Sequence, residues 1–364
     1  MRVFIRSICR IASTLALAAV MVSAAAAAES GGSYDSITED IGKPNDWRQI
    51  VADSPFRLGE PTPAGYVNGV EIYELGYGTY PSVDGSTVAV PMAMEFARQH
   101  LGLGEDDLYS FVFLNTTHSA YENLILKKPN RAPQIPSMYA RMDQNHPVDL
   151  MIGTEPSDEE LALAAENGVE LVKIPACLDA FVFIVNADNP VDNLSLEQIR
   201  GIYAGDITSW QEVGGAPAAI EAYQREKNSG SQTAMENLVM KGAAMDGALP
   251  NYTTSGMEGL VYAVGDYENG QGAIGYTYLY YLNELIDGGG VKAISVNGVA
   301  PTAENIRSGE YAFSTYYYAV YRREDADAAG GKFADWIASA EGQACVGQAG
   351  YISLEAKGAE VDAR

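Results

Sequence analysis

The stretch Y-Q-R-E-K-N-S-G-S-Q, residues Tyr223–Gln232, combines an arginine with a short hydroxyl-rich loop. Arg225 carries a fixed positive charge on a planar fork of donors, which suits a tetrahedral oxyanion. Ser229, Gly230 and Ser231 follow, and then T-A-M-E-N-L-V-M, which has helical spacing. A serine here would cap the helix, whose first turn leaves backbone N–H groups available to an anion. The alternative is a capped surface helix with an unrelated arginine before it.

A second loop of this kind lies closer to the N-terminus. Gly85, Ser86 and Thr87 precede the helical segment V-A-V-P-M-A-M-E-F-A-R-Q-H-L. Pro91 fits this helix only in its first turn, where the missing N–H group costs nothing. The helix therefore starts near Ser86 and Thr87, and the loop is a second candidate anion site, with a plain helix cap as the alternative.

A third loop follows an apolar segment. We predict a strand over Phe111–Leu114, then the loop N-T-T-H-S, then the helical segment A-Y-E-N-L-I-L. Thr116 and Thr117 are the candidate ligands in this loop, and Asn115 competes with them because the register is open.

The segment G-T-E-P-S-D-E-E-L follows a predicted buried strand over Val148–Ile152. Ser157 and Glu160 have the spacing of a capping box for a helix over Glu159–Asn167. Further strands are predicted at Leu171–Ile174, Asp179–Asn186, Gly272–Tyr276, Val291–Val296 and Tyr311–Tyr321. Strands that alternate with helices predict an α/β fold with a parallel sheet covered on both faces. Ligands of such sheets gather at the carboxyl ends of the strands, where these polar loops lie.

The first 28 residues have the pattern of a secretory signal peptide. Arg2, Arg6 and Arg10 precede the apolar run Ile11–Val22, and small residues up to Ala28 provide a cleavage site. Cys9 precedes the apolar run, so we expect no lipid anchor and a soluble secreted or periplasmic protein. Residues 29–64 are rich in Gly, Ser, Asp and Pro and are predicted to form an extended N-terminal arm.

The chain is strongly acidic, with a formal net charge of −25 over 364 residues. Removal of three signal-peptide arginines would give −25 − 3 = −28 for the mature chain. Such a charge argues against a nucleic acid as partner, because a phosphate backbone requires a cationic surface.

Two cysteines remain after cleavage, Cys177 and Cys345, and in an oxidising compartment they predict a disulfide. Two separate buried thiols are the alternative.

One long block of the chain resembles a known family. The block N-P-V-D-N-L-S-L-E-Q-I-R-G-I-Y-A-G-D-I-T-S-W-Q-E-V-G-G, then R-E-K-N-S-G-S-Q, then A-I-G-Y, is similar to the periplasmic phosphate-binding proteins of ABC transporters. The resemblance runs from about Tyr80 to Leu354. It implies a type II periplasmic binding protein fold, in which two α/β lobes are joined by two crossover strands around a ligand cleft.

The resemblance also implies the borders of the lobes. Lobe one would comprise residues 65–184 and 285–364, and lobe two residues 185–284. The crossings would lie near Asp179–Asn186 and within Tyr276–Val296. Both cysteines would then belong to lobe one, which permits the disulfide.

The family binds phosphate with an arginine, a Ser-Gly-Thr loop, hydroxyl residues of the first lobe and an acidic residue. In this chain Ser231 replaces the threonine, and Glu155 replaces the usual aspartate as acceptor of the proton on phosphate. An acid at a helix N-terminus is the alternative for Glu155. The implied ligand residues are Ser86, Thr87, Thr116, Thr117, Glu155, Arg225, Ser229, Gly230 and Ser231. The resemblance further implies a monomer that docks on a membrane permease, without cofactor or metal.

Other classes remain as alternatives. A secreted phosphatase or hydrolase would need an activated nucleophile or a metal cluster. The three histidines, His100, His118 and His146, are widely spaced, and the chain contains neither G-x-S-x-G nor H-E-x-x-H. A phosphate sensor, or a receptor for sulfate or molybdate, would share the anion-binding features.

The acceptor role of Glu155 generates a prediction about selectivity. Sulfate has no proton at neutral pH, so its oxygen would face the carboxylate oxygen and be repelled. We expect Glu155→Gln to remove this repulsion and let sulfate compete with phosphate. Competition calorimetry measures the ratio of the two affinities, and an unchanged ratio in the variant would refute the role.

Overall fold

A computed structural model describes residues 54–67, 69–130, 140–245, 253–254, 256–265, 272–286 and 290–354. The predicted signal peptide, residues 1–28, and most of the predicted arm lie outside the described residues.

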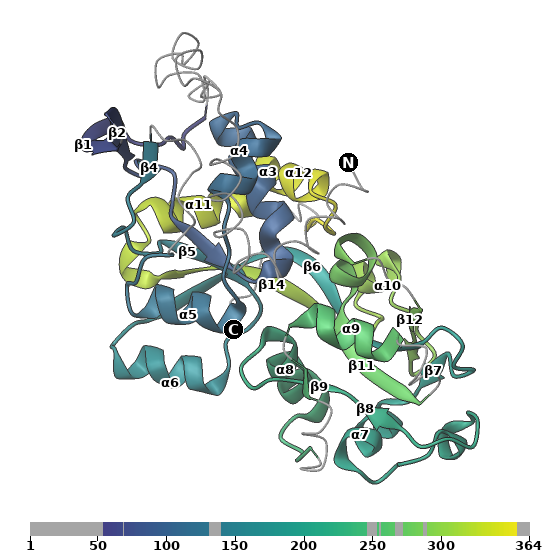
Figure 1. Cartoon of the computed structure of the whole chain (residues 1–364). Helices are drawn as coiled ribbons and strands as arrows, with labels where there is room; N and C mark the ends of the chain where they lie inside the picture. Colours follow the sequence, from purple (N-terminus) through teal and green to yellow (C-terminus); the bar gives the residue numbers. More distant parts are fainter. Residues whose placement is uncertain are drawn as a thin grey trace.

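A seven-stranded sheet runs through both halves of the molecule (Figure 1). Its order is β3 (Val83–Gly85), β5 (Leu150–Gly153), β14 (Ser314–Arg322), β6 (Leu171–Asn186), β11 (Ala273–Tyr278) and β8 (Glu221–Ala222), with β12 (Val291–Ala293) also paired to β6. The β3–β5 and β11–β8 pairs are parallel, whereas β14 and β11 are antiparallel to β6. The prediction of a parallel sheet is therefore wrong for the centre, because the strands that connect the two halves run in opposite directions.

Strand β6 is the physical link between the halves. Its residues 171–180 pair with β14, and its residues 181–186 pair with β11 and β12. The sequence predicted two strands here, and the structure has one of 16 residues. The strand continues through Pro175, because its pairing with β14 shifts register beside this residue. A proline, which has no N–H group, is tolerated at such a bulge.

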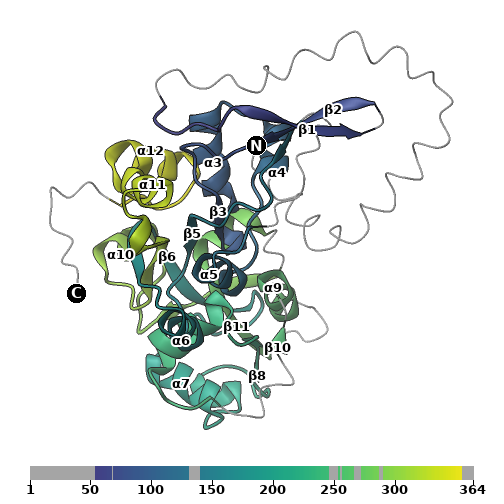
Figure 2. The ribbon, with the colours of Figure 1, turned by 90° about the vertical axis from the view of Figure 1, so that its left-hand side faces the viewer.

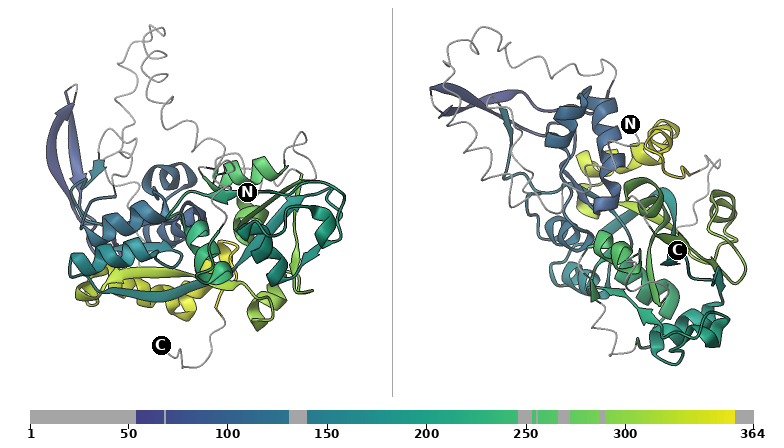
Figure 3. Two further views of the ribbon diagram at one scale, coloured as in Figure 1. Left: turned by 90° about the horizontal axis from the view of Figure 1, so that it is seen from below. Right: turned by 45° about the vertical axis from the view of Figure 1, so that its right-hand side comes forward.

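Helices and short strands complete two lobes (Figure 3), which we name by their strands: the first lobe surrounds β3, β5 and β14, and the second surrounds β8 and β11. The first lobe combines segments from both ends of the described chain. Its helices are α3 (Val90–Leu101), α4 (Glu105–Phe111), α5 (Thr117–Ile125), α6 (Asp158–Glu166), α11 (Ala329–Ala338) and α12 (Ala340–Gln348), with the short turns η3 (Thr87–Ala89) and η8 (Arg323–Asp325). The second lobe has α7 (Leu196–Ala204), α8 (Gly230–Ala234), α9 (Met257–Gly265) and α10 (Ala303–Ser308), the turns η4 (Trp210–Val213) and η5 (Met235–Met240), and the strands β7 (Asn193–Leu194), β9 (Gln224–Arg225), β10 (Thr253–Thr254) and β13 (Ser295–Val296). The turn η7 (Tyr281–Leu285) follows β11.

Most predicted helices begin near the residues that were predicted to start them. The capping box of Ser157 and Glu160 is present at the start of α6, and Pro91 lies in the first turn of α3. The predicted strand Phe111–Leu114 is wrong, because Phe111 ends helix α4. Leu108 of that helix is fully buried, so helical spacing, not alternation, places the apolar residues of this segment in the core.

Two short strands, β12 and β13, follow the predicted end of the second lobe at residue 284. Strand β12 pairs with residues 184–186 of β6, and β13 pairs with β7. Strand β7 lies within the predicted second lobe, and β14 lies in the first. The predicted lobe border at residues 284–285 stays a prediction.

The end of the predicted arm belongs to the packed fold. Phe56 is buried against Phe333 and His100, and the hydroxyl of Ser54 lies 2.8 Å from Nδ1 of His100. The chain then forms a hairpin of β1 (Pro61–Val67) and β2 (Val70–Leu75), which pairs with β4 (Ala140–Met142) and projects from the first lobe (Figure 2).

The two mature cysteines are separate buried thiols, so the predicted disulfide is wrong. Cys177 lies on β6 near Asp179 and Tyr317, and burial raises its pKa. Cys345 lies on α12, where burial and the carboxylates Glu95 and Glu341 raise its pKa to about 11. The thiols are held in different surroundings although both belong to the first lobe.

A buried carboxylate lies where β6 passes from one lobe to the other. Oδ1 of Asp179 accepts hydrogen bonds from the backbone N–H groups of Ala180, at 2.7 Å, and Tyr280, at 3.1 Å. Its Oδ2 has no hydrogen-bond partner within the described residues. Burial raises the pKa of Asp179 to about 7, and the two N–H groups oppose this shift.

The pKa of Asp179 generates a prediction about stability. The carboxyl group of Asp179 loses its proton near pH 4 in the unfolded chain and near pH 7 in the folded protein. Its contribution to the free energy of unfolding is therefore complete below pH 4 and is lost as pH rises to 7. We expect Asp179→Asn to raise the free energy of unfolding at pH 8, by at most about 4 kcal/mol at 1.36 kcal/mol per pH unit. The gain shrinks as pH falls toward 4, measured by denaturant unfolding. The exposed Asp188→Asn is the control, and a pH-independent effect of Asp179→Asn would contradict the prediction.

Candidate ligand-binding site

A cavity of about 400 Å³ lies between the two lobes. Of the predicted ligand residues, all except Glu155 line it. The first lobe contributes Ser86, Thr87, Thr116, Thr117, His118 and Thr154, and the second contributes Arg225, Glu226, Lys227, Ser229, Gly230, Ser231, Gly256, Met257 and Tyr278.

The first loop leaves β3 in close contact with β5. A Cβ atom on Gly85 would lie 2.2 Å from the carbonyl oxygen of Ile152, so only glycine fits here. The N–H group of Ser86 donates to the same oxygen at 2.9 Å. This contact places Ser86 and Thr87 at the cavity, at the start of the turn η3 and helix α3.

A buried carboxylate, Asp84, holds the first and third loops together. Its Oδ1 accepts from the N–H groups of Gly85, at 2.8 Å, and Asn115, at 2.9 Å. Its Oδ2 accepts from the side-chain amides of Asn115, at 2.8 Å, and Asn123, at 2.9 Å. Burial raises the pKa of Asp84, and these donors oppose that shift. Asn115 therefore supports the loop, while its neighbours Thr116 and Thr117 line the cavity.

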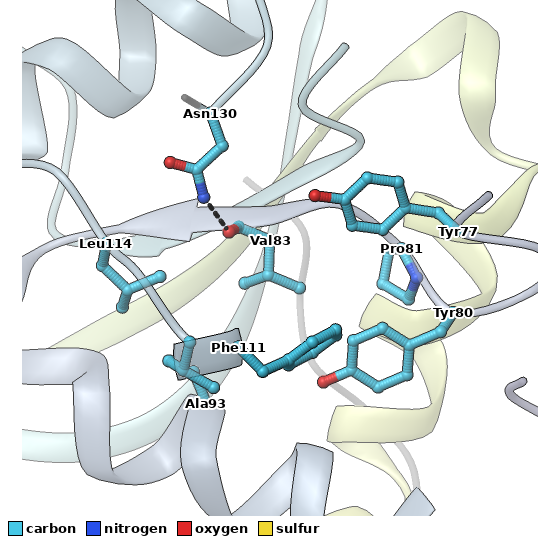
Figure 4. A pocket seen from close by; sticks show the side chains of 9 residues that line it. Tyr77, Tyr80, Pro81, Val83, Ala93, Phe111, Leu114 and Asn130 are labelled. Atoms are coloured by element: carbon cyan, nitrogen blue, oxygen red, sulfur yellow. Dashed lines mark hydrogen bonds between the residues drawn. The ribbon is translucent and has the colours of Figure 1, made fainter. Parts of the chain in front are cut away.

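Figure 4 shows a second, smaller hollow beside this network, with a volume of about 20 Å³. Asn130 closes it by donating to the carbonyl of Val83 at 2.7 Å, and the amide oxygen of Asn130 accepts from Asn115 at 2.9 Å. Rings of Tyr77, Tyr80 and Phe111 form much of the remaining wall. The hollow has room for about one water molecule, so it belongs to the support of the loops and not to a ligand site.

Arg225 is held in place by its backbone and its side chain. Its N–H group donates to the hydroxyl of Tyr276 at 3.0 Å and to Oε1 of Gln232 at 3.2 Å. Its Nη1 donates to the hydroxyl of Ser231 at 3.3 Å, and its Nη2 lies 3.5 Å from the carboxylate of Glu226. The side chain is only 6% exposed. Burial lowers the pKa of Arg225 and Glu226 opposes the shift, but a guanidinium keeps its charge.

The loop after Arg225 turns tightly into α8. Asn228 has a left-handed backbone, with φ of 63°, and Ser229 caps the helix by accepting from the N–H group of Gln232 at 3.3 Å. The short α8 continues into the π-helical turn η5, an irregularity often found at functional sites. Gly230 and Ser231 therefore present the first backbone N–H groups of this helical segment to the cavity.

The lobes touch at Gly230. A Cβ atom at this position would lie 2.6 Å from Oγ1 of Thr154 and 2.8 Å from Oγ1 of Thr117. Both threonines belong to the first lobe and are buried. Within the described residues, Oγ1 of Thr154 has no hydrogen-bond partner. The glycine therefore allows second-lobe backbone to approach first-lobe hydroxyl groups closely.

Glu155 does not line the cavity. Its carboxylate forms an ion pair with Lys173 and is 39% exposed. The preceding residue, Thr154, lines the cavity instead, because successive side chains of an extended segment point in opposite directions. Sequence reasoning missed Thr154, although its position after the strand Leu150–Gly153 was a usable signal. The ligand role of Glu155 stays a prediction.

The cavity is also lined by ionisable residues that were not among the predicted ligand residues. Nδ1 of His118 lies 2.8 Å from the buried carboxylate of Glu160, which also completes the capping box of α6. Glu226 and Lys227 line the cavity beside Arg225.

The described residues contain no group of three or more His, Cys, Asp or Glu side chains arranged to hold a metal ion. Among the described helices, none is long and apolar enough to cross a membrane.

The chain is similar in sequence to known proteins. The model of the PBP superfamily domain matches residues 141–341. The phosphate-binding protein PstS of Bacillus subtilis is 25% identical over 232 residues, which cover 58% of this chain and 74% of that protein. The PstS of Borreliella burgdorferi is 26% identical over 181 residues, 49% of this chain and 64% of that protein, so the match spans slightly less than two thirds of its length.

Solved structures share the fold. A phosphate ABC transporter substrate-binding protein from Clostridium perfringens, with bound phosphate, has a TM-score of 0.54 and 25% identity. The match covers 76% of this chain and 100% of that chain. An ABC-type phosphate transport receptor from Vibrio cholerae, with a TM-score of 0.51 and 22% identity over 75% of this chain and 99% of its own, shows the fold alone.

The contact at Gly230 generates a prediction about the cavity. We expect Gly230→Ala to force the lobes apart, since the new methyl group would overlap the hydroxyls of Thr117 and Thr154. The affinity for an anion should fall about tenfold or more, in the range of overpacking costs of about 1–3 kcal/mol. Calorimetry with inorganic phosphate measures the change. Gly347→Ala, where a Cβ atom meets no neighbour, is the control, and equal affinities in both variants would contradict the prediction.

Proposed function

Because the chain belongs to the PBP superfamily, we propose that it is an extracytoplasmic receptor that captures inorganic phosphate between its two lobes. In this proposal the loaded receptor delivers phosphate to the permease of an ABC transporter. The PstS relatives and the phosphate-bound structure from Clostridium perfringens support the choice of ligand and transporter. The signal-peptide pattern of residues 1–28 supports export.

One observation carries the proposal: donors from both lobes meet at a single cavity around a buried guanidinium. Arg225 and the helix start at Gly230 and Ser231 come from the second lobe, and the hydroxyl loops come from the first. An oxyanion accepts hydrogen bonds at every oxygen, so a closed cavity must offer donors on all sides. This requirement fits the cavity. Hydroxyl groups of the first lobe line one wall, and the guanidinium and the helix start of the second lobe line the opposite wall.

The overall charge of the protein makes local donors necessary. A molecule with a net charge of −25 repels an approaching anion at long range. Salt screens this field over about 10 Å at 0.1 M ionic strength, so fixed dipoles and the charge of Arg225 dominate inside the cleft. We infer that the acidity serves solubility and that recognition depends on the cavity.

Closure would link binding to transport. An ion that touches both lobes forms more contacts in the closed state than in the open state, and it therefore shifts the population toward closure. We propose that the permease recognises the closed form of a monomeric receptor. A binding protein of this kind needs no catalytic step, cofactor or metal.

Arg225 is the first test of the proposed function. We expect Arg225→Ala to lower the affinity for phosphate by about 30-fold to more than 1000-fold, as for removal of one partner of a buried charge pair at about 2–5 kcal/mol. Arg225→Lys should bind more weakly than wild type, since lysine lacks the planar fork. Calorimetry measures the affinities, and small-angle scattering measures closure on addition of phosphate.

The control is Arg323→Ala, which removes an exposed arginine paired with Glu170 in the first lobe. Competition with sulfate and molybdate in the same calorimeter identifies the preferred oxyanion. Wild-type protein that binds none of the three ions would overturn the proposed function. Phosphate-induced closure of Arg225→Ala would refute the role of the guanidinium.

A further inference from the structure

One carboxylate of the first lobe contacts two consecutive residues of the second lobe. Glu159, in the first turn of α6, accepts hydrogen bonds from Nζ of Lys227 and from the side-chain amide of Asn228. The two donors lie in the turn between Arg225 and the helix start at Ser229. Lys227 also lines the cavity, so the contact lies at its edge.

These bonds join parts of the chain that only the fold brings together. Lys227 and Asn228 are 68 and 69 positions away from Glu159. They belong to the second lobe, whereas α6 packs on α5 of the first lobe. The bonds therefore exist only while the lobes are close, as does the neighbouring packing of Gly230 on Thr117 and Thr154.

We propose that Glu159 is a positioning residue that latches the two lobes together and holds the turn that carries the anion-binding groups. This inference rests on the proposed function and adds a residue to it that contacts no ligand. The carboxylate anchors the side chain of Asn228, whose left-handed backbone directs the chain into Ser229 and Gly230. Loss of the latch would leave the turn and the lobe less restrained, so a bound ion would leave faster.

The electrostatics fit a latch that can open. Lys227 and Asn228 lower the pKa of Glu159, and Glu159 raises the pKa of Lys227, so both groups are charged at neutral pH. The side chains of Glu159 and Lys227 are 51% and 72% exposed. Exposed pairs contribute little and weaken in salt. A receptor must release its ion at the permease, and a weak contact at the edge of the cleft does not prevent this.

Kinetics of phosphate binding test the latch. We expect Glu159→Gln and Lys227→Gln each to raise the dissociation rate of phosphate about two- to fivefold, the range of exposed ion pairs. In the double variant Glu159→Gln with Lys227→Gln the two effects should not add, since both substitutions break the same ion pair. Stopped-flow fluorescence measures the rates, and the difference between wild type and variants should shrink as salt increases.

The matched control is Glu324→Gln. Glu324 pairs with Lys127 within the first lobe, and both side chains are about as exposed as those of the latch, at 57% and 54%. We expect this control to keep the wild-type dissociation rate. Unchanged rates in both latch variants, or fully additive effects in the double variant, would overturn the proposal.

Scattering from the protein without ligand separates this proposal from the proposed function. We expect Glu159→Gln to have a larger radius of gyration than wild type at low salt, and the double variant Glu159→Gln with Lys227→Gln to be no more open than Glu159→Gln alone. If wild type binds no phosphate but this difference is found, the proposed function fails and the latch stands. Identical scattering of all variants, together with unchanged rates, overturns the latch alone.

Discussion

The buried guanidinium of Arg225 is the interaction on which the site depends. A fixed charge that is only 6% exposed loses most of its hydration, and the surrounding groups must compensate for this loss. Tyr276 and Gln232 fix the backbone of Arg225, while Ser231 and Glu226 contact its side chain. The guanidinium lies at a cavity whose lining includes hydroxyl groups of both lobes. In the proposed function an oxyanion completes this arrangement.

A continuous strand makes the two-lobe cavity possible. Strand β6 pairs with β14 in one half and with β11 and β12 in the other, so both lobes share one hydrogen-bonded backbone. The buried Asp179 lies at the passage between the halves and bonds the N–H group of Tyr280, which follows β11.

The cavity walls are supported by different interactions on the two sides. On the first lobe, the carboxylate of Asp84 ties two loops together through four donors, and Gly85 rests on the carbonyl of Ile152. On the second lobe, the turn before α8 is shaped by the left-handed Asn228 and by the cap at Ser229. Support of this kind holds donors in place before a ligand arrives, which lowers the entropy lost on binding.

The sequence alone determined the features that depend on local chemistry. Caps, a first-turn proline and a glycine between two serines specify helix starts within a few residues, so α3, α5, α6 and the loop at Ser229 could be predicted. The clustering of the hydroxyl loops around Arg225 followed from the family resemblance, and the cavity contains all of the predicted ligand residues but one.

Only the tertiary structure decided the features that depend on contacts between distant residues. The antiparallel centre of the sheet, the separate thiols of Cys177 and Cys345, and the exchange of Glu155 for Thr154 at the cavity wall all follow from how segments pack across the fold. Glu155 turns to Lys173, and Glu159 reaches Lys227, because the three-dimensional fold places those charges side by side. Spacing along the chain carries no information about such partners, whereas a helix cap is complete within four residues.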